Sequence, residues 1–229
     1  MREVVVDTET TGLDPADGHR IIEIGCVELE DHVPTGRSLQ FYLNPQRAVP
    51  LDAQRIHGIS DAFLKDKPVF GAICEELDAF LGDAPLVIHN AGFDLKFLNW
   101  ELNLVGRPIL PFGRAIDTIE IAKAKIPGAR YSLDELCKRF AIDLSGRTKH
   151  GALLDAELTA RVYLELVGGR QTQMKLGMAA AASEIAAGPA RVRQRPRPLG
   201  SRIAAAEREA HAVFVAEELG PDAVWGSER

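Results

Sequence analysis

Residues 3–12 form the stretch E-V-V-V-D-T-E-T-T-G, in which three valines lead directly into Asp7 and Glu9. The valines predict a short buried β-strand. Because side chains alternate between the two faces of a strand, Asp7 and Glu9 should point to the same side. Two such carboxylates repel each other, and a divalent cation such as Mg²⁺ or Mn²⁺ would remove that cost. Taken alone, the short D-x-E pattern favours a solvated turn, so further carboxylates are needed to indicate a metal site.

The composition bounds the class of protein. With 229 residues, 46% of them apolar, the chain fits one domain plus an appendage, or two small domains. The sequence contains no apolar run long enough to cross a membrane, and the early charges of Arg2 and Glu3 argue against a signal peptide. The cysteines are odd in number and far apart, which indicates reduced core thiols of a cytoplasmic protein rather than disulfides or a zinc site. They are Cys26, Cys74 and Cys137.

Charge is unevenly distributed. The chain carries a formal net charge of −6, which argues mildly against a broad nucleic-acid surface. Residues 170–208 hold eight Lys or Arg and two Glu, a net charge of +6, so the remainder carries −12. An acidic body with a basic strip predicts two parts with different roles.

The first 170 residues alternate between strand and helix patterns. Strands are predicted over 3–7, 20–30 and 38–45, the second half-exposed, with a turn near Pro34 and Gly36 and short links that favour an antiparallel meander. The later pattern predicts an α/β fold with a mixed sheet and packed helices. The further predicted elements are helices over 69–81, 93–102, 132–140 (N-capped by Ser132, with Glu135 completing a capping box) and 152–167, and strands over 85–90 and from 115.

Two more acids and a histidine lie where they can join the first pair. Asp94 follows the strand L-V-I-H-N, Asp155 lies near the start of a late helix, and His150 precedes Asp155 by five residues. On a helix that offset is about 140°, so His150 should lie on the segment before the helix. Taken one at a time, Asp94 would be a partner for the helix dipole, Asp155 a solvated acid and His150 an exposed histidine. Converging at one sheet edge, they predict a two-metal phosphodiester hydrolase in which His150 takes the proton of water.

With these motifs in place, the chain resembles the DEDDh exonucleases of the DnaQ type. The resemblance covers residues 1–170 and rests on V-D-T-E-T-T-G, H-N-A-G-F-D and H-G-A-L-L-D-A. It implies an RNase H-like α/β fold, a mixed five-stranded sheet flanked by helices, with a flexible C-terminal tail bearing one helix. It further implies two divalent ions, Mg²⁺ or Mn²⁺, and His150 as the catalytic general base. The implied metal ligands are Asp7, Glu9, Asp94 and Asp155.

The same resemblance implies where substrate binds. The segment I-H-G-I-S, residues 56–60, is similar to the family segment that contacts the 3′-terminal nucleotide. Asp117, in A-I-D-T, corresponds to another family acid, with an implied supporting rather than ligating role. The implied substrate-binding residues are Asp7, Glu9, Thr10, Ile56, His57 and Asp155.

Residues beyond the nuclease motifs imply partners. Within the family the chain is most similar to the proofreading epsilon subunits of bacterial DNA polymerase III. Residues 171–202 then contain a clamp-binding peptide, Q-T-Q-M-K-L, followed by a basic linker. Residues 203–229 form a segment for the polymerase alpha subunit, with a helix predicted over 203–219; a theta-like subunit is a further implied partner. The implied partner-binding residues are Gln171, Met174, Leu176, Phe214 and Trp225.

Other functions remain open at this point. A DEDDh exoribonuclease of the oligoribonuclease or RNase T type would have the same metal site, but it would not need residues 171–229. A DnaQ-like repair exonuclease is a second alternative. A polymerase accessory without activity is a third, although the intact acidic motifs argue against it. The favoured function is removal of mismatched nucleotides from a DNA 3′ end, since a mismatched end separates more easily into a single strand.

Overall fold

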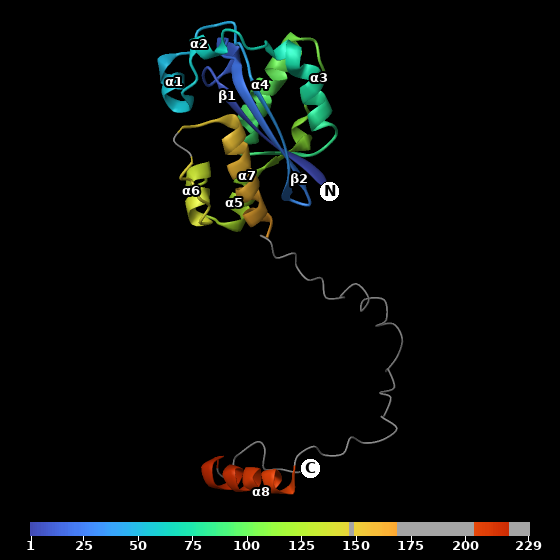
Figure 1. Cartoon of the computed structure of the whole chain (residues 1–229), viewed down its shortest axis with the longest axis vertical. Helices are drawn as coiled ribbons and strands as arrows, with labels where there is room; N and C mark the ends of the chain where they lie inside the picture. Colours follow the sequence, from blue (N-terminus) through green and yellow to red (C-terminus); the bar gives the residue numbers. More distant parts are fainter. Residues whose placement is uncertain (147–148, 169–203, 220–229) are drawn as a thin grey trace, which may run out of the picture. The chain divides into compact units, whose positions relative to one another are not determined.

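A computed structural model describes residues 1–146, 149–168 and 204–219. The chain divides into two units, Met1–Met174 and Lys175–Arg229 (Figure 1). The first unit contains a five-stranded sheet in the order β3-β2-β1-β4-β5. Its strands are β1 (Arg2–Thr10), β2 (Ile21–Glu30), β3 (Val33–Tyr42), β4 (Leu86–Ile88) and β5 (Ala115–Asp117).

The sheet is mixed, as predicted. β1 pairs antiparallel with β2, and β2 pairs antiparallel with β3, which confirms the predicted meander. β1 and β4 are parallel, as are β4 and β5. The α-helices of the first unit are α1 (Leu51–His57), α2 (Asp61–Leu64), α3 (Phe70–Leu81), α4 (Ala91–Leu104), α5 (Thr118–Lys125), α6 (Leu133–Arg139) and α7 (Ala152–Val167). Two 3₁₀ turns lie at η1 (Pro15–Asp17) and η2 (Phe112–Arg114).

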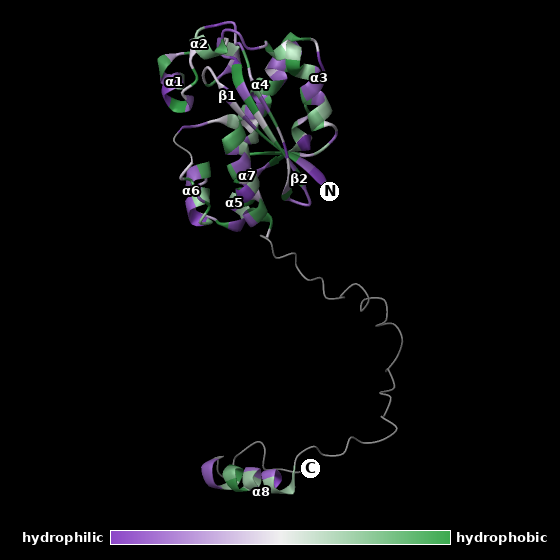
Figure 2. Ribbon diagram, in the orientation of Figure 1, coloured by the Kyte–Doolittle hydropathy of each residue, from purple (hydrophilic) through white to green (hydrophobic). Residues whose placement is uncertain are grey.

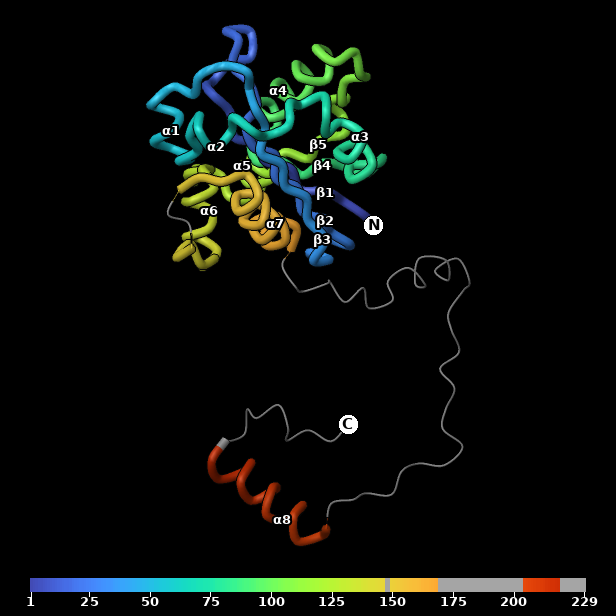
Figure 3. The backbone as a smooth tube through the Cα atoms, turned by 45° about the horizontal axis from the view of Figure 1, so that its top comes forward, coloured from blue at the N-terminus to red at the C-terminus, as the bar shows by residue number. Residues whose placement is uncertain are grey.

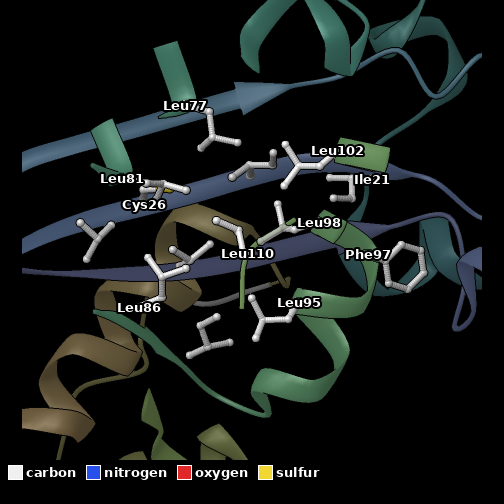
Figure 4. Packing of buried hydrophobic residues seen from close by; sticks show 14 of the residues in the cluster. Ile21, Cys26, Leu77, Leu81, Leu86, Leu95, Phe97, Leu98, Leu102 and Leu110 are labelled. Carbon is white, nitrogen blue, oxygen red and sulfur yellow. The ribbon is translucent and has the colours of Figure 1, made fainter. Parts of the chain in front are cut away.

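Helices cover both faces of the sheet (Figure 3). Val4 and Val6 pack with leucines of α3 and α4 in the largest core cluster, part of which is drawn in Figure 4. Val5 points the other way and packs against α7, at Ala156 and Ala160. Strand alternation therefore puts the odd-numbered residues of β1, including the opening carboxylates, on the α7 face. The helices carry both hydrophobic (green) and hydrophilic (purple) stretches in Figure 2, as expected of helices that pack on a core by one side.

Two sequence-based expectations for the meander were wrong. Residues 20–30 were expected to be half-exposed, but every residue from Ile21 to Leu29 is buried, because β2 is covered by helices on both faces. The turn expected near Pro34 and Gly36 lies earlier, at Asp31 and His32, whose φ angles are 50° and 68°. Both expected turn residues belong to β3, an edge strand, where proline is tolerated.

A close backbone contact positions α7 on the sheet. A Cβ placed on Gly25 would lie 2.3 Å from the backbone carbon of Ala152 and from the backbone nitrogen of Leu153. Only glycine allows the first turn of α7 to approach β2 this closely. The predicted helix over 152–167 is confirmed, and Gly168 follows it as the C-cap.

The remaining predicted helices are also present. Ser132 Oγ accepts a hydrogen bond from the Glu135 amide, as expected of an N-cap, but the Glu135 carboxylate pairs with Lys138 rather than completing a capping box. The three cysteines are buried, and they form no disulfide with one another. α1 and α2 were not expected, because their short sequences lack a long apolar period.

In the second unit, the described residues form one helix, α8 (Ala205–Phe214), which continues as a π-helical turn over Val215–Leu219. This confirms the helix predicted over 203–219 within the described residues. Val213 and Phe214 are 49% and 54% exposed, so the helix has an uncovered apolar side. Among residues 1–146, 149–168 and 204–219, no helix combines the length and the apolar composition that a membrane span requires.

Candidate active site

The predicted site residues come from separate elements and meet at one end of the sheet. Asp7 and Glu9 lie at the end of β1, Asp94 in the first turn of α4, and Asp155 in the first turn of α7. Thr8 connects two of these elements: its backbone nitrogen and its Oγ1 donate to Asp94 Oδ1, at 2.9 Å and 2.7 Å. Asp94 is therefore tied directly to the strand that carries the opening pair.

His150 lies immediately before α7, as its offset from Asp155 predicted. The helix begins after Gly151, and the His150 Nδ1 atom lies 3.1 Å from Asp155 Oδ2. The backbone nitrogen of His150 donates to the Ile56 carbonyl oxygen at 3.3 Å. Candidate ligand atoms of Glu9, His150 and Asp155 all lie within 4.8 Å of one another, which is compact enough for one cation.

The electrostatics indicate a site that is short of positive charge. Burial, followed by the negative charges of Asp94, Asp155 and Glu9, raises the pKa of Asp7 well above its usual value. Burial also raises the pKa of Asp94 to about 7, although the two hydrogen bonds from Thr8 oppose this shift. A divalent cation would compensate this charge, and carboxylate oxygens are the ligands that hard cations prefer. The residues present therefore fit a divalent metal site.

Asp117 supports the helix that carries Asp94. Its carboxylate caps α5 by accepting from the Ile119 amide at 2.8 Å. It also accepts from the amides of Asn90 and Ala91, at 3.2 Å and 3.0 Å. Asn90 has a φ of 71°, an uncommon conformation that these bonds help to hold. The contacts agree with a supporting role for Asp117.

The residues expected to bind substrate lie beside this cluster. Thr10 is nearly buried, and its hydroxyl donates to the Gly12 carbonyl at 2.6 Å. Ile56 is 55% exposed at the end of α1. His57 is buried; its Nδ1 accepts from the Ile59 amide at 3.0 Å, which places the proton of the neutral ring on Nε2. Nε2 itself is buried without a hydrogen-bond partner, and burial lowers the pKa of His57.

The expected partner-binding residues are mostly outside the described residues. Gln171, Met174, Leu176 and Trp225 belong to this group. Phe214 is described and lies on the exposed side of α8, next to Ala210 and Val213.

Glu23 and Leu13 were not among the residues expected from the sequence. Glu23, only 1% exposed, lies directly opposite Glu9 across β1 and β2, and its Oε1 accepts from Gln40 Nε2 at 2.7 Å. The strand period could have placed Glu23 on the same face as Glu9 had the register been known. Leu13, 83% exposed, follows the T-T-G turn at the end of β1. An exposed leucine in a turn carries no signal by itself.

Comparison with known proteins gives the family of the chain. The exonuclease family model matches residues 4–163, and the chain belongs to that family. The DNA polymerase III subunit epsilon of Rickettsia felis is 55% identical, over 77% of this chain and 78% of the relative. The subunit of the same name from Escherichia coli is 46% identical, over 77% of this chain and 75% of the relative.

Solved structures show the same fold. Exonuclease X, solved in complex with 5′ overhanging duplex DNA, has a TM-score of 0.57 at 27% identity, covering 72% of this chain and 90% of its own. The nuclease domain of 3′hExo, a DEDDh family member bound to rAMP, has a TM-score of 0.64 at 22% identity, covering 72% and 91%. The RNase H-like fold expected from the sequence is thereby confirmed, and use of a divalent metal is a property of this exonuclease family.

Proposed function

We propose that this chain is a 3′–5′ exodeoxyribonuclease that proofreads for a bacterial DNA polymerase III. The observation that carries the proposal is the meeting of four carboxylates and a histidine, from separate segments, at one end of the sheet. The identity to epsilon subunits over most of the chain supports the cellular role.

The metal ligands proposed are Asp7, Glu9, Asp94 and Asp155. They would hold two Mg²⁺ or Mn²⁺ ions, which supply a polarised water and neutralise charge on the phosphodiester. Asp155 is 4% exposed and Asp94 3%, so both are held rigidly by their surroundings. Thr8 orients the Asp94 carboxylate through two hydrogen bonds, which leaves Oδ2 for a cation.

His150 is proposed to accept the proton of the attacking water. Its side chain is 47% exposed, so it can face both solvent and substrate, and imidazole is the side chain that most often serves as a general base. Its link to the Ile56 carbonyl connects the base to the segment proposed to hold the nucleotide.

The terminal nucleotide is proposed to lie between the end of β1 and α1. Ile56 and Leu13 offer exposed apolar surface for the sugar and base. The unsatisfied Nε2–H of His57 fits an acceptor oxygen of the nucleotide, because a buried donor without a partner is costly. Thr10, whose hydroxyl is already donated to the backbone, would contribute mainly by shaping the turn.

The proposed partners bind outside the nuclease. The alpha subunit would bind residues 203–229 through the apolar side of α8, including Phe214, together with Trp225. The sliding clamp would bind Gln171–Leu176, and a theta-like subunit is a further proposed partner. Tethering would keep the nuclease at high local concentration near the primer end, and a chain bound to these partners would act in the cytoplasm.

The test compares an isosteric double variant, Asp7→Asn with Glu9→Gln, with Asp66→Asn on an exposed loop. The double variant should lose digestion of mismatched DNA 3′ ends and lose Mn²⁺ binding by calorimetry, while Asp66→Asn keeps both. A double variant that still digests DNA would contradict the metal assignment. Faster digestion of matched RNA than of DNA by the wild type would instead favour an exoribonuclease.

A second experiment tests the partners. The chain ending at Gly169 should keep nuclease activity but fail to co-elute with the polymerase alpha subunit. Co-elution of the truncated chain would show that the alpha subunit binds elsewhere.

A further inference from the structure

A row of three residues runs from the candidate active site to the edge of the sheet. Glu9 of β1 is directly opposite Glu23 of β2, and Glu23 is directly opposite Tyr42 of β3. Residues directly opposite one another share a face of the sheet. With strands about 4.8 Å apart, Tyr42 lies roughly 10 Å from Glu9, on the same face.

The row is locked by hydrogen bonds. Gln40 Nε2 donates to Glu23 Oε1 at 2.7 Å and to the Tyr42 hydroxyl oxygen at 3.1 Å. Tyr42 therefore has a fixed position relative to Glu9 and Glu23. The side chains that pack on Tyr42 are fixed relative to the same two carboxylates.

Phe63 and Lys67 pack on Tyr42. The rings of Tyr42 and Phe63 meet edge to face, with centroids 4.9 Å apart. The Lys67 Nζ atom lies 4.4 Å from the Phe63 ring centroid and 5.9 Å from that of Tyr42. Phe63 nevertheless remains 45% exposed. These three residues, Tyr42, Phe63 and Lys67, are called the aromatic platform below.

Lys67, the cation of the platform, has aromatic rings as its neighbours, whereas several other Lys and Arg side chains on this surface have a carboxylate. Several surface Lys and Arg side chains are paired with carboxylates, such as Lys96 with Asp14 and Lys138 with Glu135. No ion pair of Lys67 occurs among residues 1–146, 149–168 and 204–219. Lys67 is instead held over aromatic rings, where its ammonium group remains available to an anion.

We propose that the aromatic platform binds the strand upstream of the terminal nucleotide, with Phe63 contacting a base and Lys67 a backbone phosphate. This inference rests on the proposed nuclease function. A distance of about 10 Å corresponds to about three stacked nucleotides, or fewer in an extended strand. Aromatic rings next to a cation are the usual elements of single-strand binding without sequence preference. In a body with net negative charge, such a local cation offsets repulsion of the strand.

The experiment uses the full chain and two substrates. One is a short single-stranded oligothymidylate, which can reach the platform. The other is a thymidine 5′-monophosphate aryl ester, which has no upstream nucleotide and reaches only the catalytic residues. Phe63→Leu keeps apolar bulk but removes the aromatic face, and Lys67→Gln keeps length but removes charge. The matched control is Lys65→Gln, which changes an exposed lysine two residues away.

For Phe63→Leu, the KM for the oligonucleotide should rise by about fivefold to a hundredfold, with hydrolysis of the ester unchanged. For Lys67→Gln, the dependence of affinity on salt should become weaker. The magnitude of the slope of log affinity against log salt should decrease by about 0.7, as measured by anisotropy of a labelled oligonucleotide with chelator present. Lys65→Gln should leave both quantities unchanged.

Three outcomes would overturn the inference: wild-type oligonucleotide KM in Phe63→Leu, an unchanged salt slope in Lys67→Gln, or equal losses on both substrates. Equal losses would place the defect at the catalytic residues instead. A wild-type protein that hydrolyses neither substrate would contradict the proposed nuclease function itself, which separates the two failures.

Discussion

Replacing Asp94 with asparagine should stabilise the metal-free protein while destroying its activity. Asparagine keeps an oxygen that can accept both hydrogen bonds from Thr8, so the packing is preserved. It removes, however, a carboxylate that is 3% exposed and whose pKa is raised from 3.8 to about 7 by burial. At a pH above the raised pKa of Asp94, the folded wild type must keep an ionised carboxylate buried away from water.

The magnitude follows from the pKa shift. A raised pKa means that the folded state binds more protons than the unfolded state between pH 4 and 7, so wild-type stability falls as pH rises through that range. A shift of about three units corresponds to about 4 kcal/mol near pH 8. Near pH 5 the folded carboxyl is mostly protonated, and the difference shrinks to about 2 kcal/mol.

The assay is urea denaturation in the presence of a chelator, near pH 5 and near pH 8. Asp94→Asn should be more stable than wild type at both values, with the larger gain at the higher pH, and Asp66→Asn should differ by less than about 0.5 kcal/mol. Adding Mn²⁺ should stabilise the wild type but not Asp94→Asn. If Asp94→Asn is the less stable protein near pH 8 in chelator, the description of the site as short of positive charge is wrong.

Three further perturbations test the site and its supports. His150→Gln should lower kcat by about 10²- to 10⁴-fold while calorimetric Mn²⁺ binding stays measurable; near-normal kcat would exclude His150 as the base. Gly25→Ala should lower the free energy of unfolding and activity together, because the new Cβ overlaps the Ala152 backbone, whereas Gly113→Ala, which faces open space, should not. Arg20→Met should cost about 3–5 kcal/mol in urea denaturation by leaving the buried Glu101 carboxylate unpaired, and adding Glu101→Leu should recover most of it; no recovery would mean that packing, not charge, is lost.

The sequence predicted the candidate site better than it predicted the sheet. The positions of Asp7 and Glu9 follow from the strand period, and that of His150 outside the helix follows from its offset to Asp155, because both arguments are local. The burial of β2 could not be foreseen, since it depends on which helices cover each face. The early turn at Asp31 and His32 was missed because Pro34 and Gly36 carry the stronger turn preference.

Non-local contacts explain the remaining omissions. The role of Glu23 depends on the register between β1 and β2, and that of Lys67 depends on rings contributed by β3 and α2. Both roles depend on residues from different strands or helices, and the hydrophobic period of a single strand or helix does not reveal such contacts. The double hydrogen-bonding role of Asp117 likewise joins two helices that only the fold brings together.

The contact between Gly25 and the first turn of α7 has a consequence for how this protein tolerates change. It joins main chain to main chain, so the spacing between the strand that bears Asp7 and the helix that bears Asp155 does not depend on the size of any side chain. Efforts to raise thermal tolerance by exchanging leucines and valines beneath the sheet should therefore leave the geometry of the acids intact. A substitution at this one glycine would shift the geometry however well the interior is filled.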